Sequence, residues 1–234
     1  MKKTIGEWWL LAAIALLCFA PSGFADSLKL INGGSDVMGG VYVGPYNFTL
    51  TSGSQTSALQ LICDDFSDEV FTGETWSVTS TTVGSLNNVM FLGQSQYQQK
   101  YQEVAWLVEQ LGGLNPLSST YSKDVGDIQW AVWDIFDPSA SSTDPYGTIG
   151  GADLSVINSW ITEASTDYAG GNYSNLIIYT PVKGSQNPLA DGEPQEYFGI
   201  VPTPEPGSLA MLVIGLLALG FFAGRRKLVN GSEA

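Results

Sequence analysis

The sequence predicts an α+β fold in which β-strands dominate a single ectodomain. Short apolar runs alternate with stretches rich in glycine, serine and threonine, a pattern typical of strands joined by turns. Apolar residues at helical spacing occur in three segments in the middle of the chain. Strands on both sides of a helical middle favour an α+β arrangement. Residues 26–201 have the length of one domain with one core.

The strand candidates are the apolar runs that are rich in β-branched and aromatic residues. They are the ranges 41–50, 58–63, 75–79, 175–180 and 196–201.

The three expected helices are recognised by spacing and by signals at their ends. They occupy the ranges 97–113, 124–137 and 151–168. In the first, a pair of glycines ends the apolar pattern. In the second, Asp124 is the expected N-cap and Pro138 lies beyond the end. In the third, Asp153 is the expected N-cap.

The N-terminal end has the pattern of a secretory signal peptide. Two lysines precede an apolar stretch over residues 8–20, which is short for a membrane span. A small-x-small cleavage site then ends at Ala25. Residues 1–25 are therefore predicted to be removed on export.

The C-terminal end has the pattern of a membrane anchor. Residues 202–207 form a proline-rich linker, and 208–224 are predicted to form an apolar transmembrane helix. The segment 225–234 begins with two arginines and a lysine, which favour a cytoplasmic location for this end.

The order of these features resembles the PEP-CTERM sorting signal of Gram-negative bacteria. The resemblance is carried by Pro204, Glu205 and Pro206, by the apolar helix that follows, and by Arg225 and Arg226. It implies export, a transient single-pass anchor in the inner membrane, and an exosortase as the partner that removes the tail. The final location is then the cell surface or the extracellular matrix.

Composition excludes several classes of function. The formal net charge is −14, and the whole chain lacks histidine. The ectodomain contains four lysines and no arginine, which argues against nucleic acid and anionic lipid as ligands. Without histidine there can be no Ser-His-Asp triad, Cys-His dyad or histidine metal site. No cofactor motif is present, whereas glycan hydrolysis by a pair of carboxylates stays open.

The cysteine count singles out one thiol. The chain has two cysteines, and Cys18 lies in the predicted signal peptide. Cys63 would then be the one cysteine of the exported protein, so folding should not depend on an internal disulfide. Cys63 is a buried inert thiol, a partner in an intermolecular disulfide, or a reactive group.

Gln129 is the polar member of the apolar run "IQWAVW", residues 128–133. This run resembles the Thr-Gln-x-Ala-Ile/Val-Trp motif of bacterial surface thioester domains. In those domains an upstream cysteine bonds to the motif glutamine, and Cys63 in "LQLICDDF" stands in the matching order. The segment "VAWLVEQLGG" between them resembles a helix-then-glycine segment of the same domains. The resemblance implies an internal thioester between Cys63 and Gln129.

The chemistry of such a bond is simple. The cysteine sulfur attacks the glutamine side-chain carbonyl, ammonia leaves, and an amine of a partner later opens the thioester to form an amide. Tryptophans near the two residues are expected to exclude water, and they are Trp106, Trp130 and Trp133. Asp64 and Asp65 should disfavour a thiolate at Cys63. The alternative is a hydrogen-bonded core glutamine and an apolar filler cysteine.

The run "CDDFSDE" is a weak candidate for a calcium site. Asp64, Asp65, Asp68 and Glu69 carry the oxygen ligands that calcium prefers, but their spacing is not that of an EF-hand loop. A solvated acidic turn is the alternative.

These observations predict an exported protein of the cell surface or matrix that binds or adheres. In the most specific form, the Cys63–Gln129 thioester reacts once with an amine-bearing surface, so the protein is not an enzyme with turnover. The alternatives are a non-covalent binding or structural envelope protein with a glycan ligand, and a carboxylate-based glycan hydrolase.

Overall fold

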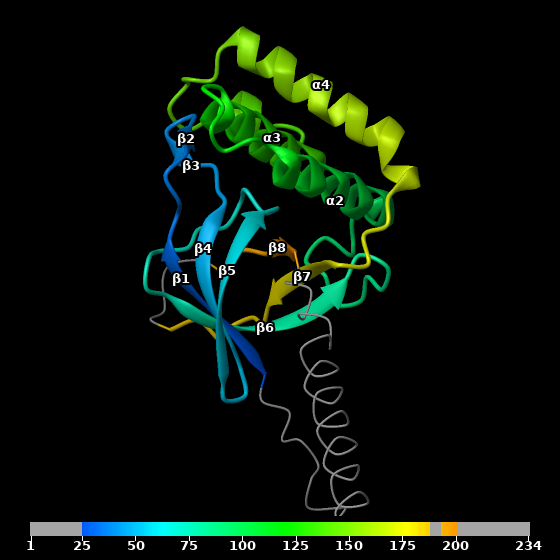
Figure 1. Ribbon diagram of the computed structural model, residues 1–234. Helices are drawn as coiled ribbons and strands as arrows, with labels where there is room; N and C mark the ends of the chain where they lie inside the picture. Colours follow the sequence, from blue (N-terminus) through cyan, green and yellow to red (C-terminus); the bar gives the residue numbers. More distant parts are fainter. Residues whose placement is uncertain (1–24, 188–192, 201–234) are drawn as a thin grey trace, which may run out of the picture.

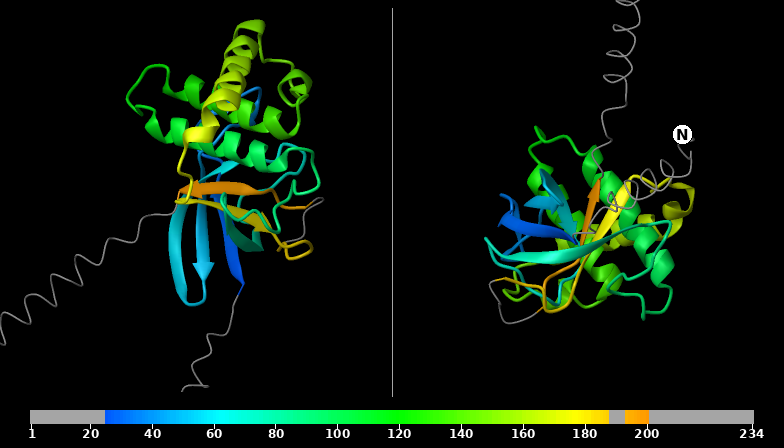
Figure 2. Two further views of the ribbon diagram at one scale, coloured as in Figure 1. Left: turned by 90° about the vertical axis from the view of Figure 1, so that its right-hand side faces the viewer. Right: turned by 90° about the horizontal axis from the view of Figure 1, so that it is seen from below.

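The computed structural model describes residues 25–187 and 193–200. Six strands close into an antiparallel barrel, and three α-helices lie together at one end of it (Figure 1). A view turned by 90° shows the helices at the same end, while the β4–β5 hairpin extends away from them (Figure 2). The predicted fold class is confirmed in its main feature: the fold is dominated by β-strands and has a small helical part.

The barrel strands follow the order β1-β4-β5-β8-β7-β6, and β6 returns to pair with β1. The strands are β1 (Asp26–Asn32), β4 (Tyr46–Ser52), β5 (Gln55–Cys63), β6 (Thr75–Thr82), β7 (Leu176–Pro181) and β8 (Tyr197–Ile200). A separate two-stranded sheet is formed by β2 (Val37–Met38) and β3 (Val41–Tyr42). Because the barrel is closed, these six strands leave no unpaired sheet edge.

Large aromatic side chains fill the barrel. The ring of Phe48 lies 5.8 Å from that of Trp76 and 4.7 Å from that of Tyr197, both in edge-on geometry. All three side chains are buried. Alternation of inward apolar and outward polar residues along β1 and β6 is the two-residue period expected of strands with one buried face.

The helices form two layers over the end of the barrel. They are α2 (Tyr97–Gly113), α3 (Tyr121–Phe136) and α4 (Gly151–Asp167). Helix α3 is buried continuously from Val125 onward and contacts α2, α4, β2 and β5. Helix α4 buries only Ile157 and Ala164. Because α3 is buried on every side from Val125 onward, it forms the centre of the packing.

Several boundaries differ from the prediction. Helix α3 begins at Tyr121, three residues before the expected cap; Thr120 donates a hydrogen bond to Asp124 at 2.8 Å. Helix α4 begins after Gly150, whose N–H donates to the Asp153 carboxylate, so Asp153 lies in the first turn. A charged carboxylate in the first turn still complements the helix dipole.

Two strand predictions also need correction. The run 41–50 is not one strand, because Gly44 has a φ of +71° and separates β3 from β4. Strand β1 was not predicted, although its apolar and polar residues alternate directly after the predicted cleavage site. The other strand candidates coincide with β5 to β8.

The predicted signal peptide and the predicted transmembrane segment lie outside the described residues. Among the helices of residues 25–187 and 193–200, none combines the length and apolarity needed to cross a membrane.

Candidate functional site

Cys63 and Gln129 lie in contact where the barrel meets the central helix. Cys63 ends β5, Gln129 lies in the buried part of α3, and both side chains are fully buried. The Gln129 Nε2 amide donates a hydrogen bond of 2.6 Å to the backbone carbonyl of Cys63. The two residues are 66 positions apart, so the contact depends on the packing of α3 against β5.

The other half of the Gln129 amide lacks a partner. Within the described residues, Oε1 is buried and accepts no hydrogen bond. It faces Gly44, where an added Cβ would lie 3.4 Å from Oε1 and 3.1 Å from the Tyr46 ring. An unsatisfied buried carbonyl costs roughly 1–3 kcal/mol of folding free energy, so Gln129 is not a fully satisfied core amide.

Cys63 is held as a neutral thiol. Its Sγ donates to the backbone carbonyl of Asp65 at 3.0 Å. Burial raises the pKa of Cys63 well above its ordinary value, and the charges of Asp65 and Asp64 raise it further, as the sequence predicted. The nearby indole N–H of Trp133 opposes this rise in the pKa.

Three aromatic rings form a cluster that reaches the Cys63 thiol through Trp133. The Phe66 ring lies 5.2 Å from each of the rings of Trp130 and Trp133, which are 4.9 Å apart. Trp106 does not belong to this group: it packs against Trp160 of α4 at 6.2 Å. The expectation that Trp106 shields the pair was therefore wrong, because its side of α2 faces α4. Phe66 belongs to the cluster instead.

A second buried polar contact lies beside the first. The carboxylate of Glu196, just before β8, accepts hydrogen bonds from the Tyr101 hydroxyl of α2, from the Thr180 hydroxyl of β7 and from the Met90 N–H. The Met90 bond is 2.9 Å long. Glu196 is fully buried, and this network ties α2 to the barrel.

Asp64 is a second buried acid beside the same carboxylate. Its buried oxygens have no donor within the described residues, and its carboxyl faces Glu196. Burial, and then the charge of Glu196, raise the pKa of Asp64 well above its ordinary value. Glu196 has a raised pKa because it is buried, and the hydrogen bond from Asp64 opposes that rise. Burial of two facing carboxyl groups thus favours a state in which the pair shares one proton.

The four acidic residues singled out by the sequence do not converge. Asp65 Oδ1 accepts the Ser67 N–H at 2.9 Å, and burial followed by the charge of Asp68 raises the pKa of Asp65 to about 7. Asp64 turns to Glu196, while Glu69 is exposed. In the part of the chain that the structure describes, no group of three or more such residues is arranged to hold a metal ion.

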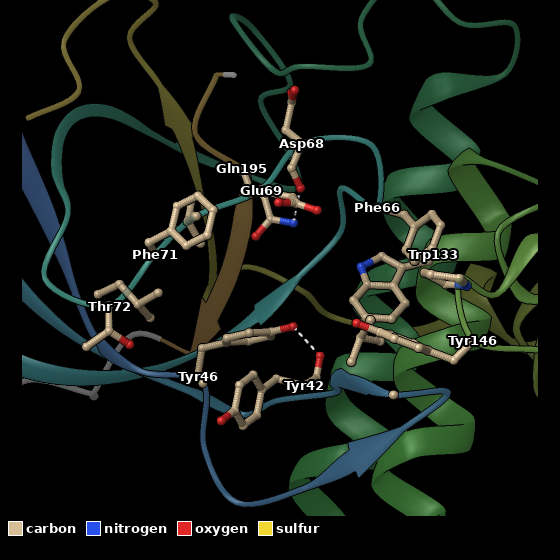
Figure 3. Close-up of a pocket in the computed structure, with 16 residues that line it drawn as sticks. Tyr42, Tyr46, Phe66, Asp68, Glu69, Phe71, Thr72, Trp133, Tyr146 and Gln195 are labelled. Atoms are coloured by element: carbon tan, nitrogen blue, oxygen red, sulfur yellow. Dashed lines mark hydrogen bonds between the residues drawn. The ribbon is translucent and has the colours of Figure 1, made fainter. Parts of the chain in front are cut away.

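A pocket of about 610 Å³ is lined by residues of the barrel, of its loops and of α3 (Figure 3). Trp133 and Tyr46 line it, and both also face the buried thiol: Trp133 through its indole N–H, and Tyr46 because a negative charge on Cys63 would raise its pKa. One layer of aromatic rings thus separates the pocket from the pair.

Sequence reasoning missed Glu196, Gly44 and Phe66. A glutamate at the start of the apolar run "EYFGIV" was a usable signal, since an acid entering a buried strand needs donors. The Gly-Pro pair within the run 41–50 was another, because it interrupts a strand. Nothing local marked Phe66 as a member of the aromatic cluster.

The PEP-CTERM protein-sorting motif matches residues 202–227 of the chain. This match includes all the predicted motif residues, Pro204, Glu205, Pro206, Arg225 and Arg226. The motif implies an exported protein that is sorted by an exosortase. Comparisons with curated proteins and with solved structures gave no match for the chain.

Proposed function

We propose that the ectodomain is a covalent adhesion module of the cell surface or matrix, and that it acts through an internal thioester between Cys63 and Gln129. The sorting motif supports the location of the protein outside the cell, and the thioester would account for its activity. The protein would react once with an amine on a neighbouring surface and form a stable amide.

The proposal rests on the incomplete hydrogen bonding of the Gln129 side-chain amide. It lies against Cys63, with Nε2 on the Cys63 carbonyl and Oε1 without a donor. A thioester carbonyl is a weaker hydrogen-bond acceptor than an amide carbonyl, so leaving it unpaired in a dry site costs less. Conversion to the thioester therefore relieves the cost of burying Oε1.

Bond formation needs one local rearrangement. The thiol has to leave the Asp65 carbonyl and turn toward the side-chain carbon of Gln129. The C–N bond breaks as the C–S bond forms, the thiol proton goes to the departing nitrogen, and ammonia is released. No oxidant or reductant is required, and the high pKa of Cys63 is consistent with transfer of a proton together with the sulfur attack.

Burial explains how the product would persist. Both residues are inaccessible to solvent, and Trp133 brings the cluster of Phe66, Trp130 and Trp133 next to the thiol. Exclusion of water suppresses hydrolysis of a reactive intermediate. A displacement of this aromatic cluster would be needed to admit the amine.

A non-covalent binding protein is the second candidate, and the aromatic pocket beside the pair favours it. The glycan hydrolase has no comparable support, because the close carboxyl pair Asp64 and Glu196 is sealed inside the protein.

The test compares intact masses of the exported wild-type protein and of Cys63→Ala. Because both share the same processed ends, their mass difference isolates the bond. With the thioester, the wild type is lighter than calculated by one ammonia relative to the variant. Reaction with methylamine then raises the mass to one methylene group (CH2) above the calculated value.

Gln129→Glu is the matched control, since it keeps size and shape but presents a poor acyl donor. It should show the calculated mass and no reaction with methylamine. If freshly prepared wild type also shows the calculated mass, Gln129 is a strained core amide and the covalent function is rejected.

A further inference from the structure

The pocket beside the pair is lined by aromatic rings from distant parts of the chain. They are Tyr42, Tyr46, Phe66, Phe71, Trp133 and Tyr146 (Figure 3). Three of them are substantially exposed: Tyr42 by 55%, Phe71 by 54% and Tyr146 by 65%. Exposed rings gathered in one concave site, rather than scattered, indicate a binding surface.

Two of the exposed rings are seated on glycine backbone. A Cβ at Gly33 would lie 2.6 Å from the Tyr42 ring, and a Cβ at Gly40 would lie 2.1 Å from the Tyr146 ring. Any other residue at either position would displace the ring. The two glycines therefore allow these rings to lie directly on the backbone at the edge of the pocket.

Several polar groups at the pocket already use their donors inside the protein. Gln195 Nε2 donates to the backbone carbonyls of Asp65 and Asp68, at 2.8 and 2.6 Å, and its Oε1 accepts from the Tyr197 hydroxyl. The Tyr46 hydroxyl donates to the Tyr42 carbonyl at 2.6 Å (Figure 3). The hydroxyls of Tyr42, Thr72 and Tyr146 also line the pocket, so it is the charge of the lining, rather than its hydrogen-bonding groups, that distinguishes between ligands.

The charge of the pocket is negative. Asp68 and Glu69 are the charged residues of its lining, which contains no lysine. Both ion pairs of the described residues involve Lys123, which binds Asp127 and Asp153 elsewhere. Aromatic faces and carboxylates both attract cations, so the two kinds of lining group favour the same ligand.

We propose that the pocket binds an organic cation, a protonated primary amine on an unbranched apolar stem such as the side chain of a lysine. The apolar stem packs on the rings of Tyr42, Phe71 and Tyr146, and the ammonium group faces Asp68 and Glu69. This binding stands without the thioester. The assignment of the same cation as the amine that opens the bond rests on the function proposed above.

In that second role, the pocket brings the amine to the aromatic layer beside Cys63 and Gln129. The ammonium releases one proton to solvent, and its nitrogen bonds to the Gln129 side-chain carbon. The C–S bond breaks, and the sulfur takes the second proton from the nitrogen. The products are a substituted amide at Gln129 and a free thiol at Cys63.

The experiment titrates cadaverine into the exported Cys63→Ala protein by calorimetry, because this variant cannot react. 1,5-Pentanediol has the same stem without the charges and serves as the ligand control. We expect saturable binding of cadaverine only. The Asp68→Asn/Glu69→Gln double variant should weaken it about tenfold, which corresponds to the loss of a charged contact of ordinary strength. Binding should also weaken as salt is added.

The matched protein control is Glu163→Gln/Asp167→Asn, which removes the same charge from the exposed face of α4 and should leave binding unchanged. Equal binding of pentanediol, equal loss in both double variants, or preferential binding of a neutral oligosaccharide would overturn the proposal. Should Cys63→Ala melt at a lower temperature, Cys63→Ser replaces it.

The two proposals can fail separately. Cadaverine binding to Cys63→Ala together with a normal wild-type mass retains the pocket and rejects the thioester. A mass deficit in the wild type without cadaverine binding to the variant retains the thioester and rejects the pocket.

Discussion

Two buried polar contacts join the barrel to its helices, and they differ in how well they are satisfied. Glu196 meets α2 through Tyr101 and accepts donors from several further elements. Gln129 of α3 meets Cys63 with one half of its amide, and the other half finds no partner among residues 25–187 and 193–200. The contacts are neighbours, since the Asp64 N–H donates to the Glu196 carbonyl.

The difference indicates different roles. A buried carboxylate surrounded by donors is stable only in that arrangement, so Glu196 fixes the position of α2. A buried amide with an unpaired oxygen is a local cost that folding elsewhere has to offset. The first contact therefore contributes stability, and the second is the group on which the proposed thioester depends.

The largest expected effect comes from removing the satisfied contact. Glu196→Ala leaves the donors from Tyr101, Thr180 and Met90 without an acceptor, and the free energy of unfolding should fall by roughly 3–5 kcal/mol. Urea denaturation measures the change. Asp64→Asn is the control: its amide can donate to Glu196 in place of the shared proton, so it should cost much less. Equal losses in the two variants would contradict the shared proton.

The second prediction tests whether a covalent bond between Cys63 and Gln129 cross-links the fold. A bond that closes the 66-residue interval between Cys63 and Gln129 stabilises the fold by roughly 4 kcal/mol in the chain-entropy model. Treatment with methylamine should therefore lower the unfolding free energy of the wild type by about 2–4 kcal/mol. Cys63→Ala should not respond. A wild-type transition that methylamine leaves unmoved contradicts the cross-link.

The third effect concerns pH. Asp65 has a pKa of about 7 in the folded protein, against 3.8 for an ordinary aspartate. Between these values the folded state retains a proton that the unfolded state has lost. Stability should therefore fall as pH rises from about 4 to 7, by on the order of 2 kcal/mol from this group, and level off above that range.

Thermal melting of the wild type and of Asp65→Asn across this range measures the contribution. The variant cannot titrate at this position and should show a shallower decline. The Asp64–Glu196 pair, Asp127 and Asp134 also have raised pKa values and contribute to the decline that persists in the variant.

The smallest expected effect on the free energy of unfolding comes from Gly44, which faces the Gln129 side chain. Gly44→Ala places a methyl group 3.4 Å from Gln129 Oε1, on a backbone with a φ of +71°. The left-handed conformation costs a residue with a side chain about 1 kcal/mol, which chemical denaturation can detect. Gly53→Ala is the control, with a φ of +58° and open space around it. A similar loss in both variants would assign the whole effect to the backbone.

The sequence by itself determined the features that depend on local pattern. The motif from Pro204 to Arg226 is a linear signal and was recognised without a fold. The spacing in residues 97–113 predicted α2, because helical periodicity is a local property. The absence of histidine excluded whole classes of catalysis. The sequence also selected Cys63 and Gln129 as a pair to consider.

Only the tertiary structure decided which groups meet. The spacing in α2 predicted a buried face but not that Tyr101 would bind Glu196, which is 95 positions away. Helical spacing likewise did not show which neighbour Trp106 would contact, and in the structure it packs against Trp160 of α4. The pocket likewise combines rings such as Tyr42 and Tyr146 that no local pattern connects. Periodicity defines the face that a segment buries, whereas closure of the barrel and packing of α3 select the partner, because contacts between distant residues depend on the whole chain.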